Sequence, residues 1–295
     1  MIKFSLPGYI ENELLIGYFF DLQKNAPHFF IENRCLDSAY GMPGHMIWNG
    51  GRSRFNLPVQ GPEIYQTINY LHEHGVKLRH TCTNMLLTQG HLYDWTCNQF
   101  ISYCEQEGDS IIVFAPELAN YIREKYPKYN IIWSTTRRDD DINIINNLSQ
   151  TDMLVLDYKY NKDYSVLASL KNPKNIEIVC GENCVPDCPA RLAHYADISR
   201  HQLLFPNIDE IFTCPYNREK PFNFYEEIQR QPHAILDRDI EYLYNQYGIE
   251  NFKISGRTIT PHLLIEMILY YTIKPEYRDT IRQTALYLAY EKFYS

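Results

Sequence analysis

Residues 62–81, PEIYQTINYLHEHGVKLRHT, predict one helix followed directly by one strand. In PEIYQTINYLHEHG the apolar residues are spaced as on an amphipathic helix, Pro62 suits the first turn, and Gly75 suits the position after the last turn. The run VKLRHT that follows is short and apolar enough to be buried on both faces, as a strand of a parallel sheet requires. The stretch therefore predicts one repeat of an α/β architecture.

The same alternation continues along most of the 295-residue chain. Short β-branched or aromatic runs predict eight strands, at residues 2–6, 29–32, 76–81, 110–115, 130–135, 153–157, 176–180 and 252–255. Amphipathic segments such as PELANYIREKYP lie between them. Eight strands in βα alternation predict an α/β fold, a closed (β/α)8 TIM-like barrel. A doubly wound open sheet is the alternative, but SLPGYIENE lacks its glycine-rich turn.

The chain contains no linker rich in Pro, Gly or Ser, so we expect one domain over residues 1–295. A cysteine-bearing insert of about 70 residues, approximately residues 181–250, separates the seventh strand from the eighth. Inserts after barrel strands lie on the C-terminal face, where active sites form. Two tyrosine-rich helices, approximately residues 260–295, follow the last strand.

Charge and composition limit the kinds of binding partner and the cellular location that we expect for the protein. A formal charge of -8 argues against a general polyanion-binding surface, so nucleic acid is not indicated, although a local basic cluster could hold a small anion or one RNA element. MIKFSLPGYI lacks a secretory layout, and no run of about 18 apolar residues predicts a membrane span. We expect a cytoplasmic protein, whose eight cysteines then favour thiols or metal ligands over disulfides.

Three cysteines lie close together in CGENCVPDC, namely Cys180, Cys184 and Cys188, and Cys214 follows in TCPY. Thiolates are soft ligands that suit iron–sulfur clusters and zinc, and four of them complete either site. The spacing departs from the C-x-x-C pairs of structural zinc sites, which favours an iron–sulfur cluster over zinc. Cys35 follows the second predicted strand and could face the same barrel mouth, but a core thiol is the default for it and for the others, Cys82, Cys97 and Cys104.

Polar residues after predicted strands are candidates for substrate binding, because a barrel displays its reactive groups there. Asn49 and Arg52 lie in the glycine-rich loop WNGGRSR, Arg79 and Asn84 at the end of the third strand, and Arg137 after the fifth. Arginine forks suit carboxylates and phosphates, so these residues predict a small anionic substrate. A surface loop remains the alternative for WNGGRSR.

Three further residues are candidate catalytic groups. Asp157, with Lys159, could form an acid–base pair at the end of the sixth strand, or a structural ion pair. His194, six residues beyond Cys188, could donate to a cluster sulfur, move a proton or bind metal. Arg257, at the end of the last strand, could seat an anionic substrate or close the barrel with a salt bridge.

The segments NCVPDCPARLAHY, TCPY and GIENFKISGR resemble peptidase family U32, the collagenase-like group, in its CP-x-R-x-x-H and F-K-x-x-G-R patterns. The resemblance implies a (β/α)-barrel with a four-cysteine [4Fe–4S] cluster, and members act in oxygen-independent hydroxylation of quinone precursors and of transfer RNA. By position it assigns Cys184, Cys188 and Cys214 as ligands. Cys180 is the fourth by proximity, Cys35 or an open iron position being the alternatives. Related proteins sometimes work as pairs, so a related heteromeric partner is possible.

These observations predict an iron–sulfur redox enzyme acting on a small or RNA-borne substrate. A non-catalytic scaffold or partner subunit stabilised by metal is the first alternative. A peptidase is the second, although the sequence has no G-x-S-x-G, H-E-x-x-H or P-loop motif.

Overall fold

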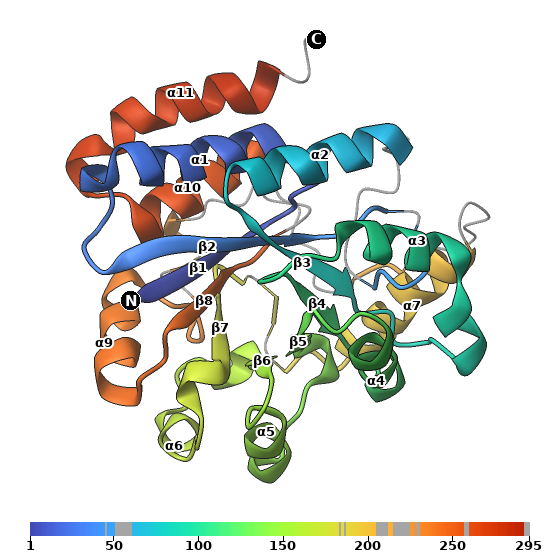
Figure 1. Cartoon of the computed structure of the whole chain (residues 1–295). Helices are drawn as coiled ribbons and strands as arrows, with labels where there is room; N and C mark the ends of the chain where they lie inside the picture. The colour runs from blue at the N-terminus through green and yellow to red at the C-terminus, as the bar shows by residue number, and fades with distance from the viewer. Residues whose placement is uncertain are drawn as a thin grey trace.

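Eight parallel strands pair in chain order, and β8 pairs back onto β1, which closes the sheet. The computed structural model describes residues 1–44, 46–50, 61–182, 184–185, 187–204, 212–214, 225–226, 228, 231–256 and 260–291. The predicted (β/α)8 TIM-like barrel is confirmed (Figure 1). Its strands are β1 (Ile2–Pro7), β2 (Arg34–Gly41), β3 (Lys77–Cys82), β4 (Ser110–Val113), β5 (Asn130–Trp133), β6 (Met153–Val155), β7 (Ile176–Cys180) and β8 (Asn251–Ile254).

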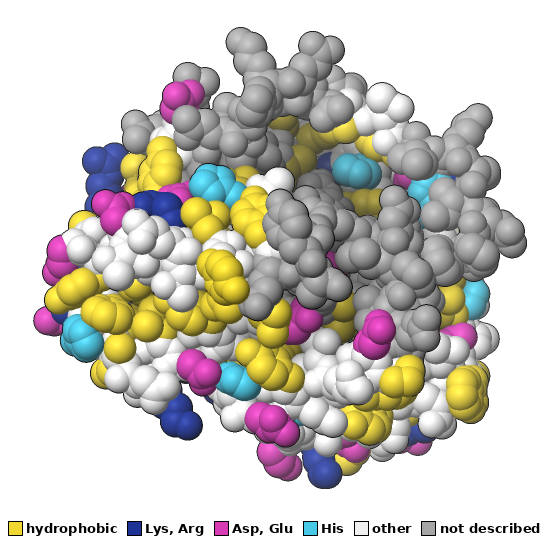
Figure 2. Space-filling model, turned by 90° about the horizontal axis from the view of Figure 1, so that it is seen from above, with side chains coloured by type: hydrophobic (Ala, Val, Ile, Leu, Met, Phe, Trp, Pro, Cys, Tyr) yellow, Lys and Arg dark blue, Asp and Glu magenta, His cyan; other side chains and the backbone are white. Residues whose placement is uncertain are grey.

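Helices surround the barrel on all sides in Figure 1. They are α1 (Glu13–Asn25), α2 (Gly61–Glu73), α3 (Trp95–Cys104), α4 (Pro116–Lys125), α5 (Ile142–Leu148), α6 (Tyr164–Ala168), α7 (Arg191–Leu204), α9 (Asp237–Tyr247), α10 (Pro261–Thr272) and α11 (Arg278–Glu291). The two predicted C-terminal helices are therefore present, and α11 packs on α10 and α1. Seen from above, hydrophobic side chains form a band across this face (Figure 2), and α11 carries the exposed Tyr287 and Tyr290. No described helix is long and apolar enough to cross a membrane.

The second strand lies later in the chain than predicted. Residues 29–32 do not form it: Phe29 ends a short 3-10 helix, and its ring packs on Tyr277 at 4.7 Å. The true strand, RCLDSAYG, escaped recognition because its inward positions include the polar residues Asp37 and Ser38. Between Leu36 and Ala39, which both face the helix layer, the register against β1 shifts by one residue and places Asp37 at a bulge.

Strand residues alternate between an outer core, beneath the helices, and the barrel interior. One end of the interior is filled by an apolar cluster, which we call the interior apolar layer: Tyr40, Ile112, Ile132, Val155, Tyr158 and Val179. Towards the N-terminal ends of the strands the interior is polar. Glu177 accepts hydrogen bonds there from Ser5 Oγ at 2.9 Å and from Arg79 Nη1 at 2.6 Å.

Lys253 completes this buried polar group. Its Nζ lies 3.9 Å from Glu177 Oε2 and 3.2 Å from the centroid of the Tyr40 ring. Burial alone raises the pKa of the Glu177 carboxyl, but the charges of Arg79 and Lys253 outweigh that effect and hold the pKa below its ordinary value. Glu177 is therefore an ionised carboxylate inside the barrel.

Candidate functional site

A buried ion pair lies at the C-terminal ends of β6 and β7. Asp157 follows β6 by two residues and caps the next turn by accepting the backbone N–H of Lys159. Arg191 is the first residue of α7, and its Nη1 lies 2.9 and 3.0 Å from the two oxygens of Asp157. Both side chains are almost completely buried, at 0% and 1% exposure. Burial of a charged pair at the catalytic end of a barrel marks this place as the candidate site.

Aromatic rings pack against the Arg191 guanidinium, and only some of its remaining N–H groups form hydrogen bonds to described residues. Its carbon lies 4.0 Å from the centre of the Tyr158 ring, and Nε donates to Tyr195 Oη at 2.9 Å. Nη2 is buried and has no hydrogen-bond partner among the described residues. Arg138 also approaches Asp157, with Nε 3.7 Å from Oδ2, and this Nε is buried without a hydrogen-bond acceptor in the described part of the chain. Two buried N–H groups near Asp157 therefore have unused hydrogen-bonding capacity.

Tyr158 connects this pair to the cysteine segment. Its hydroxyl contacts the Cys184 thiol and donates to Val185 O at 3.5 Å, and burial is the main reason that its pKa is raised well above the ordinary value. The phenol therefore stays protonated. Glu182 accepts the backbone N–H of Cys184 at 2.9 Å, and the His233 ring packs on Tyr158 at 5.4 Å. A thiol, a phenol and two guanidinium groups thus meet at one end of the barrel.

The predicted cysteine ligands divide between two environments. Successive residues of β7 point to opposite sides of the sheet, and Glu177 and Val179 face the barrel interior. The Cys180 thiol therefore faces the outer core, where it is completely buried. Burial raises the pKa of this thiol well above its usual range. Cys184, by contrast, packs against the interior apolar layer. Strand alternation therefore separates Cys180 from Cys184, and the structure gives Cys180 the position of a core thiol.

Cys188 lies just before α7, and the short segment that contains Cys214 contacts α7 through Phe212. Cys188 is buried, and its carbonyl oxygen accepts the backbone N–H of Arg191. Cys214 is half-buried. Two residues before it, the Phe212 ring stacks on the predicted catalytic His194 at 4.9 Å, and the Phe212 N–H donates to Asp197 Oδ2.

The arrangement does not fit a preformed metal centre. All four predicted ligands are described, yet no group of three or more His, Cys, Asp or Glu side chains among the described residues is placed to hold a metal ion. Cys35, the alternative fourth ligand, lies at the opposite end of the barrel. It is the second residue of β2, close to Lys3 and Lys77. The alternative that Cys35 faces the mouth does not hold, because the second strand begins at Arg34 and Cys35 lies at its start.

The predicted substrate-binding residues also separate. Arg79 is the third residue of β3 and points into the N-terminal half of the barrel, so its predicted place at the mouth was wrong. Arg137 is bound by Asp139 and stacks on Trp133 at 4.9 Å. Asn84 is buried and donates to Ile47 O and Ser199 O, which ties the loop after β3 to α7.

Asn49 is completely buried. Arg52 and the predicted catalytic Arg257 lie outside the described residues. Arg138 follows the fifth strand beside Arg137, so its position near the mouth was visible in the sequence. The residues that the sequence did not indicate are Tyr158 and His233. Tyr158 carried a usable signal, because it directly follows Asp157.

The class defined by these observations is a (β/α)8 barrel with a candidate site at its C-terminal face. No protein-family model matches the sequence, and no curated protein matches it. Among solved structures, the U32 peptidase Mk0906 is similar over 87% of this chain and 93% of its own, with 14% sequence identity and a TM-score of 0.54. The predicted resemblance is confirmed at the level of the fold, which is U32-like.

Proposed function

We propose that this chain is a U32-like barrel enzyme that binds an anionic group of its substrate at the C-terminal ends of β6 and β7. The supporting observation is the buried Arg191 guanidinium, which Asp157 neutralises while Nη2 has no acceptor among the described residues. A buried N–H without a partner costs free energy that an oxygen of a bound carboxylate or phosphate would recover. Arg138 offers a second N–H beside the same carboxylate.

Anion binding is tested by titrating the protein with inorganic phosphate in a calorimeter. Arg138→Gln removes one donor without breaking the Asp157–Arg191 pair, and we expect about tenfold weaker binding at this site. Arg238→Gln on the exposed face of α9 is the charge-matched control and leaves the affinity unchanged. Equal affinity for phosphate in both variants would refute the proposed anion site.

For the chemistry at this site we propose redox catalysis with an iron–sulfur cluster, such as oxygen-independent hydroxylation of a small or RNA-borne substrate. Supporting it are the soft donors of Cys184, Cys188 and Cys214, which belong to segments that pack near the first turns of α7. Because no metal-binding group is preformed among the described residues, cluster binding requires the segment between β7 and α7 to rearrange. Cys180 takes no part, since its thiol faces the outer core.

The cluster proposal is tested by iron, zinc and acid-labile sulfide content after anaerobic purification, together with absorbance at about 400 nm. We expect iron and sulfide in the parent protein and their loss in Cys184→Ala and Cys188→Ala. Cys104→Ala, at a buried thiol of α3, is the matched control and keeps the metal. A colourless, iron-free anaerobic preparation would overturn the cluster, and zinc alone would favour a structural centre.

Two other functions give different results in the same variants. A metal-stabilised scaffold loses stability on removal of Cys184 or Cys188 without any lost turnover. A peptidase, suggested by the name of the similar structure, cleaves casein or denatured collagen. Cleavage that Cys184→Ala abolishes and Cys104→Ala preserves would replace the redox proposal.

A further inference from the structure

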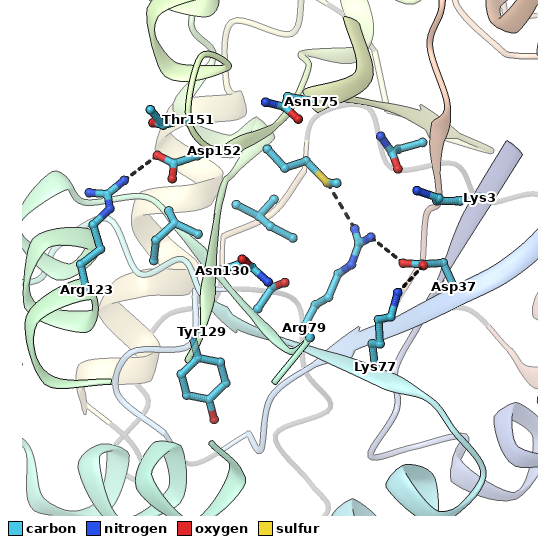
Figure 3. A pocket seen from close by; sticks show the side chains of 16 residues that line it. Lys3, Asp37, Lys77, Arg79, Arg123, Tyr129, Asn130, Thr151, Asp152 and Asn175 are labelled. Carbon is cyan, nitrogen blue, oxygen red and sulfur yellow. Dashed lines mark hydrogen bonds and ion pairs between the residues drawn. The ribbon is translucent and has the colours of Figure 1, made fainter. Parts of the chain in front are cut away.

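A cavity of about 390 Å³ lies at the opposite end of the barrel from the candidate site (Figure 3). The first residues of many strands line the cavity, so it lies at the N-terminal end of the barrel. Residues at or next to strand starts that line it include Lys3, Lys77, Ser110, Asn130, Met153 and Asn251. Cavities of this size hold metabolite-sized molecules.

The cavity is positively charged although the protein as a whole is acidic. Four lining residues are cations, Lys3, Lys77, Arg79 and Arg123, and two are carboxylates, Asp37 and Asp152. The difference, four minus two, is +2, whereas the chain carries a formal charge of -8. The interior neighbours Lys253 and Glu177 add one charge of each sign and leave this difference unchanged. A local field opposite in sign to the whole molecule attracts anions into the cavity.

Three of the four cations form ion pairs with carboxylates, and the fourth, Lys3, does not within the described part of the chain. Arg79 is fixed by Glu177 and Asp37, Lys77 donates to Asp37 at 2.8 Å, and Arg123 pairs with Asp152. The Lys3 ammonium group forms no hydrogen bond or ion pair with any described residue. Figure 3 shows Lys3, Lys77 and Arg79 around Asp37, and Arg123 with Asp152 at the other side of the cavity. One half-buried lysine thus lines the cavity without a hydrogen bond or ion pair to any described residue, and its charge acts on the nearby Asp37 only at longer range.

The interior apolar layer separates this cavity from the candidate site. Ile132 belongs to that layer and also lines the cavity, so the apolar side chains form its inner wall. Tyr158, at the other limit of the same layer, contacts Arg191 and Cys184. A ligand bound at the N-terminal end therefore touches none of the groups proposed for catalysis.

We infer that the N-terminal cavity is a second ligand site that binds a small polar molecule bearing a phosphate group. The phosphate lies against Lys3 and the neighbouring Lys77 and Arg79 side chains. The amides of Asn130, Asn175 and Asn251, with the Ser110 hydroxyl, line the remaining space and suit the hydroxyl groups of a sugar-sized remainder. The site is separate from the proposed catalytic function and stands without it.

The test is calorimetric titration of the whole protein with ribose 5-phosphate, with ribose as the uncharged control. Lys3→Gln removes the unpaired cation without breaking any described ion pair. We expect about tenfold weaker ribose 5-phosphate binding at the N-terminal cavity, because the charged hydrogen bond between the Lys3 ammonium group and the bound phosphate is lost. Lys24→Gln, at an exposed lysine of α1, is the matched control and keeps the parent affinity. Thermal unfolding of each variant verifies that it is folded.

Arg138→Gln distinguishes the two ends of the barrel. If both sites bind phosphate groups, Lys3→Gln and Arg138→Gln each weaken one binding event and leave the other unchanged. Binding that persists in Arg138→Gln and is lost in Lys3→Gln supports the cavity even if the C-terminal proposal fails. Binding lost in Arg138→Gln and unchanged in Lys3→Gln overturns the inference, as does equal affinity for ribose and ribose 5-phosphate.

Discussion

Replacing Glu177 by Gln should destabilise the barrel strongly, because this carboxylate compensates two buried cations. It accepts from Arg79 Nη1 at 2.6 Å and from Ser5 Oγ at 2.9 Å, and Lys253 Nζ lies 3.9 Å away. Exposure of the Glu177 side chain is 1%, and those of Arg79 and Lys253 are 5% and 11%. Glutamine has the same shape but removes the negative charge, which leaves both cations with less compensation in the interior.

The size of the effect follows from which partners remain. Removing one member of a buried pair costs about 3–5 kcal/mol, mostly through the charge that stays behind. Arg79 keeps a weaker contact with Asp37 at 3.4 Å, and the glutamine oxygen can still accept one hydrogen bond. We therefore expect a loss of about 3 kcal/mol in the free energy of unfolding, at the lower end of that range.

Urea unfolding at neutral pH measures this loss. If only stability has changed, the slope of the unfolding free energy against urea concentration is the same in the variant and the parent protein. The control is Glu250→Gln. Its partner Lys174 is 76% exposed, so the pair is screened by solvent and its loss should cost under about 1 kcal/mol. Equal stability of the two variants would refute the view that Glu177 neutralises the barrel interior.

Three further outcomes follow from burial. Burial lowers the pKa of His80 to about 4, whereas the unfolded chain titrates near 6.5, so the unfolded state binds the proton first and stability falls as the pH drops from 6.5 towards 4. Between pH 6.5 and 5 we expect a loss of about 2 kcal/mol in the free energy of unfolding, and a flatter profile in His80→Phe. Below pH 4.5, protonation of Glu177 removes further stability, and Glu177→Gln lacks that second decline. A thiol reagent added to the native, metal-free protein should react quickly with only the three half-buried cysteines, Cys35, Cys184 and Cys214, counted by mass spectrometry.

The fold was predictable because most strands carry a strong apolar signal. Seven of the eight predicted runs overlap true strands, and the exception is β2, whose inward positions hold Asp37 and Ser38. An apolar run was expected, and the nearest one, at residues 29–32, packs against the C-terminal helices instead. Long-range packing of Phe29 on Tyr277 leaves no trace in the local sequence.

The candidate site was only partly predictable. Asp157 at the end of β6 was selected correctly as a residue of the C-terminal face, because position after a strand is a local property. The direction in which a strand residue points also follows from the local sequence, because successive side chains point to opposite sides of the sheet. Glu177 is the polar residue of an otherwise apolar strand, and Cys180, three residues later, points to the opposite side. The pairing of Asp157 with Arg191 depends on how the chain returns after β7, which the sequence does not specify locally.

The two ends of the barrel hold their buried cations in the same way. Arg79 is neutralised by Glu177 of β7 at the N-terminal end, and Arg191 is neutralised by Asp157 after β6 at the C-terminal end. Each pair is already formed in the structure, so the anion binding that we propose at each end requires no reorganisation of the guanidinium group. Because the interior apolar layer lies between the pairs, a ligand held at one end does not touch the charged groups at the other. A barrel arranged in this way can evolve two ligand sites independently, since the strands supply a separate set of side chains to each end.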